Sequence, residues 1–233
     1  RPLLLLLLLT WCSTGRDLPS KPQQNLVIPV APGESVEVTV YSPPRIRADV
    51  LLLPGYKHDR ERWVRETELK HKATELGFQL ICPEMSTTIY ESSYFPETRS
   101  RWKSVPGLVF ITDHLLPELA RQKITSKSRP FFILGLSTGA RGAALIALAK
   151  PDTFKAVGML SGDFDQTRET HDRLITAVYG PYGAHKERWK NSDNSLTRAG
   201  EWKHPAYLAH GSKDTIVPSF HTQIFYDAIQ ARG

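Results

Sequence analysis

The residues of this 233-residue chain with the clearest chemical potential form the pentapeptide Gly-Leu-Ser-Thr-Gly at positions 135–139. An apolar run, PFFIL, precedes it, and a run of mostly small, helix-favouring residues, ARGAALIALA, follows it. A G-x-S-x-G pattern between a strand and a helix is typical of a nucleophile elbow, a sharp turn that exposes the serine hydroxyl. Gly135 and Gly139 leave room for the strand and the helix to approach closely. The pattern therefore predicts that Ser137 is a nucleophile, placed at the positive end of the helix dipole.

A carboxylate that could support this nucleophile lies later in the chain. Asp214 stands in the segment HGSKDTIVP at 210–218, directly after the apolar run PAYLA at 205–209. Triads on such sheets follow the order serine, acid, histidine along the chain. Because active residues of parallel sheets gather at the carboxyl ends of the strands, we predict Asp214 as the triad acid. The alternative is a turn-forming aspartate that caps the next helix.

An oxyanion hole requires two backbone N–H groups directed at the developing negative charge. One is expected from Thr138, the residue after the nucleophile. The other is expected from the loop after the apolar run at 50–53, where Gly55 permits a tight turn and Tyr56 follows it. We therefore predict the amides of Tyr56 and Thr138 as the two donors, with the Tyr56 ring as a wall of the acyl pocket.

The general base is the member of the triad that the sequence does not supply plainly. Eight histidines are present, and only His221 follows Asp214. The expected base lies on a loop after a further helix and strand, which needs more than the 19 residues between positions 214 and 233. We therefore expect a chain truncated at both ends that lacks its catalytic histidine. His221 is interpreted as a surface or packing residue, and it remains the alternative base.

Alternating strands and helices are predicted to position these residues. The alternation of apolar and polar residues at 36–41 predicts a half-buried strand, and the continuous apolar run at 50–53 predicts a strand covered on both faces. Further strands are expected at 78–81, 130–134, 154–160 and 205–209, and helices at about 60–76, 108–119, 140–149 and 219–231. In the last helix the predicted inner face consists of Phe220, Ile224, Phe225 and Ala228. This order predicts one α/β domain over 25–233, a mostly parallel sheet with helices on both faces.

Composition and charge argue against several other classes. The formal charge of +6 arises from 30 basic and 24 acidic residues that are scattered along the chain. No nucleic-acid recognition motif accompanies them, so no nucleic-acid partner is expected. The sequence contains no phosphate loop, metal-ligand cluster or cofactor fingerprint, which fits chemistry that needs no cofactor.

The N-terminus carries a targeting signature. A basic start, seven leucines at 3–9 and small residues near 13 and 15 predict an incomplete secretory signal peptide over 1–15, and hence a secreted or periplasmic protein. The leucine run is too short to span a bilayer. The alternative is a lipoprotein anchored to a membrane at Cys12, although Trp11 is an unfavourable neighbour for that modification. Cys82 ends an apolar run and is predicted to be a buried small hydrophobe rather than a reactive thiol.

The chain resembles the esterase D family of α/β-hydrolases, which includes S-formylglutathione hydrolases, feruloyl and acetyl-xylan esterases, and mycolyltransferases. The matching stretches are LPGY at 53–56 with Asp59 and Trp63, ITDHLLP at 111–117, the elbow at 135–142, Ser161-Gly162, and 210–218. The resemblance covers roughly residues 48–233. It implies an α/β-hydrolase fold, C-terminally truncated, with Ser137 as nucleophile, Asp214 as acid, and Tyr56 and Thr138 as oxyanion donors. The family's downstream histidine has no counterpart here, and Pro54 stands where many members have a polar residue.

The activity that these features predict is hydrolysis of a carboxylic ester through an acyl-enzyme on Ser137. The expected substrate is a small-molecule or carbohydrate-linked ester. Acyl transfer to an alcohol and peptidase activity are alternatives of the same chemistry. A non-catalytic hydrolase-fold binding protein is the alternative that the missing histidine favours. The aromatic loop at 87–96 either stacks on a sugar or aromatic acyl group or packs locally.

Overall fold

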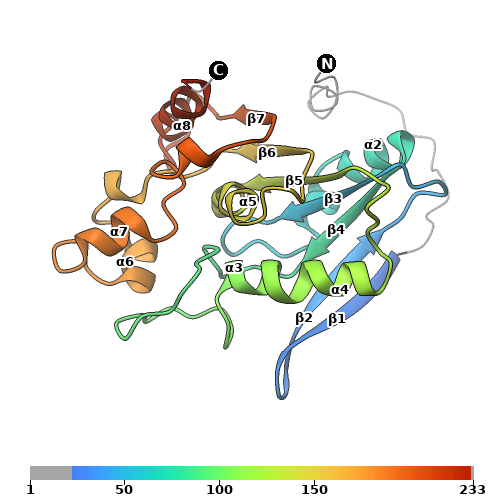
Figure 1. Cartoon of the computed structure of the whole chain (residues 1–233), viewed down its shortest axis with the longest axis horizontal. Helices are drawn as coiled ribbons and strands as arrows, with labels where there is room; N and C mark the ends of the chain where they lie inside the picture. The colour runs from blue at the N-terminus through green and yellow to red at the C-terminus, as the bar shows by residue number, and fades with distance from the viewer. Residues whose placement is uncertain (1–22, 232–233) are drawn as a thin grey trace.

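The computed structural model describes residues 23–231, whose seven strands form one sheet in the order β1-β2-β4-β3-β5-β6-β7 (Figure 1). The strands are β1 (Gln23–Ala31), β2 (Glu34–Tyr41), β3 (Ala48–Leu53), β4 (Phe78–Pro83), β5 (Phe131–Leu136), β6 (Ala156–Leu160) and β7 (Ala206–Ala209). β1 pairs antiparallel with β2, and β2 antiparallel with β4. The remaining pairs are parallel, which confirms the predicted mostly parallel sheet.

Helices cover both faces of this sheet, as predicted. They are α1 (Arg62–Glu66), α2 (Leu69–Leu76), α3 (Gly107–Val109), η2 (Phe110–Leu115), α4 (Leu116–Arg121), α5 (Thr138–Ala149), η3 (Gln166–Arg168), α6 (Arg173–Tyr179), α7 (Lys186–Asn191), η4 (Ala199–Glu201) and α8 (Phe220–Gln230). Because successive strand residues point to opposite faces, Leu51 and Leu53 pack with α5 and the α3–α4 segment, whereas Val50 and Leu52 pack with α2.

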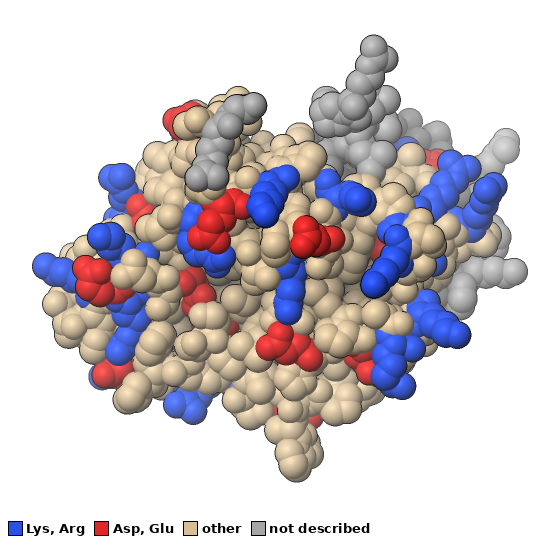
Figure 2. Space-filling model, in the orientation of Figure 1, with Lys and Arg blue, Asp and Glu red and all other residues tan. Residues whose placement is uncertain are grey.

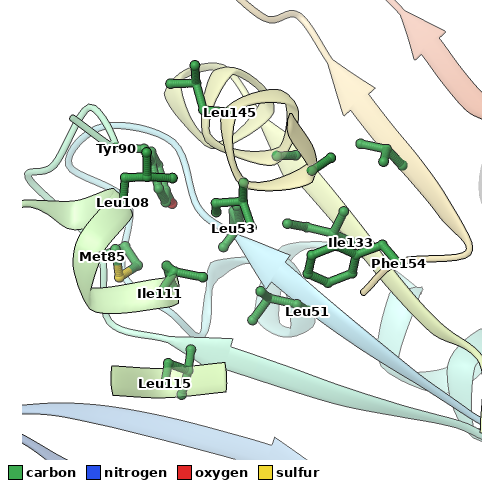
Figure 3. Close-up of a cluster of buried hydrophobic side chains, with 14 of the residues drawn as sticks. Leu51, Leu53, Met85, Tyr90, Leu108, Ile111, Leu115, Ile133, Leu145 and Phe154 are labelled. Atoms are coloured by element: carbon green, nitrogen blue, oxygen red, sulfur yellow. The ribbon is translucent and has the colours of Figure 1, made fainter. Parts of the chain in front are cut away.

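The larger part of the core lies on the α5 side of the sheet. Leu51 and Leu53 of β3 and Ile133 of β5 meet Leu145 of α5 and Ile111 of η2 there (Figure 3). All five side chains are at most 1 % exposed. This packing holds β5 and α5, the two elements that flank Ser137, in fixed positions relative to each other.

Two predicted helices differ from the structure, and one strand was not predicted. The helix expected at 60–76 is two helices, because Thr67 is in an extended conformation (φ −140°, ψ 164°) and ends α1. The helix expected at 108–119 runs from residue 107 to 121 and contains a π-helical segment, η2. β1 was not predicted. Its buried residues Leu26 and Ile28 flank Val27, which is 62 % exposed. Because Val27 is also apolar, the alternation of buried and exposed positions does not show as an alternation of apolar and polar residues.

The prediction for the inner face of the terminal helix is partly wrong. Phe225 is fully buried as expected, but Phe220 is 40 % exposed and His221 is buried in its place. The reason is that α8 packs on a ring stack: Phe225 lies against Phe164 with ring centroids 4.5 Å apart. When α8 directs Phe225 toward the core, His221 faces the core as well, because it lies one helical turn earlier on the same face.

Other predictions concern chemistry rather than packing. Cys82 is 1 % exposed, so the prediction of a buried cysteine is confirmed, and burial raises the pKa of its thiol. The predicted signal peptide and Cys12 lie outside the described residues. Within residues 23–231, none of the helices has the length and apolar character needed to cross a bilayer.

Figure 2 shows basic and acidic side chains interspersed over the face in view.

Candidate active site

Ser137 stands at a strained turn between β5 and α5. It precedes the first residue of the helix and has φ 56° and ψ −122°, a backbone conformation that non-glycine residues rarely adopt. Its N–H donates to the carbonyl of Leu160, at the end of β6, at 2.8 Å. The side chain is half-buried. The turn therefore has the strand–serine–helix geometry that the pentapeptide predicts.

Two glycines make this turn sterically feasible. A Cβ atom on Gly135 would lie 2.0 Å from the carbonyl oxygen of Gly139, and one on Gly139 would lie 2.3 Å from the carbonyl oxygen of Leu53. Both distances are far inside van der Waals contact with backbone atoms that cannot move aside. The elbow therefore requires glycine at both positions, as the sequence predicts.

The two predicted oxyanion donors flank the elbow. The loop after β3 packs on it, since a Cβ on Gly55 would lie 3.3 Å from the carbonyl oxygen of Leu136. The N–H of His58 donates to the Gly55 carbonyl at 3.0 Å and closes this loop into a turn. Neither the Tyr56 N–H nor the Thr138 N–H has an acceptor among the described residues. Thr138 opens α5, where helix N–H groups have no intrahelical partner.

Asp214 lies in the loop after β7, as predicted. Its Oδ1 accepts the N–H groups of Ile216 at 2.9 Å and Val217 at 3.0 Å. The backbone hydrogen bond from Val217 is the largest of the effects that hold the pKa of Asp214 below its usual range. The carboxyl group is therefore ionised at neutral pH, and it lies 3.4 Å from Nε2 of His210.

Backbone hydrogen bonds place Ser137 and Asp214 at the same edge of the sheet. The Ser137 N–H bonds to the end of β6, and the Ser161 N–H, just past β6, bonds to the Ala209 carbonyl at the end of β7 at 2.8 Å. The Ser161 side chain also contributes to the lowered pKa of Asp214. The nucleophile and the acid therefore both follow the carboxyl ends of parallel strands, with β6 between those strands.

His221 does not join these two residues. Its ring is fully buried and stacks on Phe220 with centroids 4.3 Å apart. Nδ1 lies 3.4 Å from Oδ1 of Asp163, and neither ring nitrogen makes a hydrogen bond to a described group. Burial lowers the pKa of the imidazole, so the ring is neutral at neutral pH. His221 thus has the geometry of a packing residue, and no histidine of residues 23–231 hydrogen-bonds to Ser137.

Sequence reasoning missed Arg141, one helical turn after Ser137. The side chain is 1 % exposed and donates to the carbonyls of Ile89 at 3.2 Å and Asp193 at 2.7 Å. It also contacts Gln166, the Tyr179 hydroxyl and Asp163. An arginine within an otherwise small and apolar helix was the available signal, because a charged residue there must find buried partners.

Among the residues described, no group of three or more histidine, cysteine, aspartate or glutamate side chains is arranged to hold a metal ion. The sheet, its helices and the serine elbow define an α/β-hydrolase. Residues 83–229 match the family described as "Putative esterase", and the chain belongs to this esterase family. No curated protein matches the sequence.

Solved structures show the same fold. Fluorophosphonate-binding serine hydrolase F (FphF) of Staphylococcus aureus is 18 % identical, with a TM-score of 0.67 over 91 % of this chain and 87 % of its own. MPT51 (FbpC1) of Mycobacterium tuberculosis is 16 % identical, with a TM-score of 0.69 over 91 % and 86 %. An S-formylglutathione hydrolase of Agrobacterium tumefaciens is 19 % identical, with a TM-score of 0.66 over 84 % and 77 %. At these identities the likeness concerns the fold.

Proposed function

We propose that this protein is a serine esterase that cleaves carboxylic esters through an acyl-enzyme on Ser137. The observation that carries the proposal is the elbow: a half-buried serine at φ 56°, held between β5 and α5 by two positions that admit only glycine. Membership of the esterase family and the likeness to serine hydrolases support the same reaction class.

In the proposed reaction the Ser137 hydroxyl attacks the ester carbonyl. The new C–O bond leaves negative charge on the carbonyl oxygen, and the N–H groups of Tyr56 and Thr138 donate hydrogen bonds to this oxyanion. Collapse of this intermediate breaks the bond to the alcohol, which departs with the proton that the Ser137 hydroxyl released. Water then releases the acid and regenerates Ser137. The substrate is a small-molecule or carbohydrate-linked ester.

Proton transfer requires an imidazole that Asp214 orients. We assign this role to no histidine of residues 23–231, because none hydrogen-bonds to Ser137. His221 in particular is turned toward Asp163. The proposal therefore predicts that this 233-residue chain is a poor catalyst to which external imidazole restores turnover.

Labelling and rescue test the proposal together. Ser137→Ala should abolish covalent labelling by a fluorophosphonate, whereas Ser126→Ala, at an exposed loop serine, should leave it intact. Imidazole at tens of millimolar should raise the rate at which the wild-type chain hydrolyses p-nitrophenyl butyrate. The Ser137→Ala chain at the same imidazole concentration is the blank, because it measures direct hydrolysis by imidazole. Labelling that survives Ser137→Ala refutes the nucleophile.

The second candidate is a hydrolase-fold binding protein without catalysis. The lack of a histidine bonded to Ser137 among the described residues favours it. It predicts neither fluorophosphonate labelling nor turnover that depends on Ser137, with or without imidazole, so the same experiment separates the two candidates.

A further inference from the structure

Residues of the loop that follows β4 and of the segment around α6 line a groove of about 980 Å³. Figure 1 shows α6 and the strand β4 that precedes this loop. Six of the residues that line it carry its chemistry: Pro96, Arg99, His171, Arg173, Pro181 and Tyr182. The elbow residues are not among the lining residues. Arg141 of α5 connects the elbow region to the groove. Its guanidinium contacts the Tyr179 hydroxyl at 3.2 Å, and Gly180, the residue after Tyr179, lines the groove.

Specific contacts hold the two walls of the groove together. The N–H of Arg99 donates to the carbonyl of Ala177 in α6 at 2.7 Å. The Thr98 hydroxyl donates to the carbonyl of Val178 at 2.6 Å. The Phe95 ring lies 6.0 Å from the Tyr179 ring, centroid to centroid. The groove is therefore preformed, as ligand sites usually are.

The charges that line the groove are unbalanced. Neither the Arg99 nor the Arg173 side chain has a hydrogen-bond or ion-pair partner within residues 23–231, and each comes from a different wall. Glu97 is the acidic residue in the lining, but Arg188 bonds to it at 2.8 Å. Like charges that share a concave surface focus a positive potential, which attracts an anion.

We propose that this groove binds an organic anion, with its carboxylate between Arg99 and Arg173 and its apolar part against Tyr182, Pro96 and Pro181. Guanidinium groups suit this role because they bind a planar carboxylate with two parallel hydrogen bonds. The identification of this anion as a carboxylate-bearing part of an ester substrate rests on the proposed function. The binding of an organic anion in the groove does not depend on that function. Inorganic phosphate shares the charge but lacks the apolar part.

Calorimetric binding to the Ser137→Ala chain tests the groove without requiring catalysis. The probes are 4-phenylbutyrate, its uncharged analogue 4-phenylbutyramide, and inorganic phosphate. We expect saturable binding of 4-phenylbutyrate that is about tenfold or more tighter than binding of the amide or of phosphate. Arg99→Gln with Arg173→Gln should weaken it by at least about tenfold and leave the thermal unfolding curve unchanged.

Lys186→Gln is the matched control, because it removes one exposed positive charge near the groove but outside its lining. It should leave the affinity within about twofold. The proposal is overturned by equal affinity for the amide or for phosphate, or by an equal effect of Lys186→Gln. It is also overturned if binding does not saturate by about 10 mM, which is tenfold weaker than a millimolar Kd. If the wild-type chain shows neither Ser137-dependent labelling nor imidazole-restored turnover while the groove still binds 4-phenylbutyrate, only the proposed function is refuted.

Discussion

At the scale of single residues, burial and hydrogen bonding give two groups near the elbow different ionisation behaviour. Asp214 lies in a turn whose N–H groups stabilise its carboxylate, so its pKa is lowered and its charge is kept. His221 is removed from solvent without a hydrogen bond, so its pKa is lowered and its charge is lost. A charged acid and a neutral, buried imidazole therefore follow the same strand of the sheet.

His221 makes stability depend on pH. The unfolded chain binds a proton at this site near the ordinary histidine pKa of about 6.5. The folded chain binds it only at a lower pH, so stability is full above this value and falls as the pH drops toward the folded pKa. His221→Phe should remove this loss while keeping a ring beside Phe220.

Urea unfolding of both proteins at pH 7.5 and pH 5 measures the effect. The variant should gain stability relative to wild type on going to pH 5, by at most about 1.4 kcal/mol per pH unit. His71→Gln, at a half-exposed histidine of α2, serves as the control. Parallel pH profiles for wild type and His221→Phe would show that burial of the imidazole has no such consequence.

At the scale of elements, the site depends on how closely α5 approaches β3 and β5. Gly139 faces the carbonyl oxygens of Leu53 and Pro54, and Gly135 faces Gly139 itself. This contact brings the start of the helix next to the loop that carries Tyr56. A wider separation would move the Thr138 and Tyr56 amides apart and weaken any oxyanion hole that they form.

Gly139→Ala tests this contact. Alanine is more favourable than glycine inside a helix by roughly 1 kcal/mol, so helix propensity alone predicts that Gly139→Ala gains stability. The clash of the new Cβ with two carbonyl oxygens predicts a loss of about 3 kcal/mol or more instead. Thermal unfolding measures it, with Gly183→Ala as the control because a Cβ there meets no atom within 4 Å. Equal melting temperatures for the two variants would contradict the close approach.

At the scale of the whole molecule, the segment between β6 and β7 is tied to the nucleophile helix through Arg141. Its partners Asp163, Gln166, Tyr179 and Asp193 all belong to that segment, and Ile89 belongs to the loop after β4. Tyr179 and Asp193 are themselves bonded at 2.7 Å, and the Asp193 carboxylate also accepts the Ser92 N–H at 2.8 Å. One buried guanidinium thus joins three distant parts of the chain.

Arg141→Met should therefore cost about 3–5 kcal/mol of unfolding free energy, because it leaves the partly buried Asp163 carboxylate and several buried acceptors without their partner. Limited proteolysis should then cut the segment between β6 and β7 before the sheet. Arg168→Met removes an ion pair in which the arginine is 59 % exposed, and it should cost no more than about 1 kcal/mol. Equal effects of the two substitutions would show that Arg141 is not a central tie.

The sequence by itself determined the parts of this protein that short-range patterns encode. Periodicity predicted the parallel strands, and the glycines around Ser137 predicted the elbow, because the steric demands of a strand–turn–helix are met within a few residues. Only the tertiary structure decided which way α8 turns, and so that His221 is buried and Phe220 is exposed. It also decided the partners of Arg141 and the groove beside α6. These features depend on segments that are distant in sequence, such as Phe164 against Phe225 and the loop after β4 against α6, and no local pattern records which of them will meet.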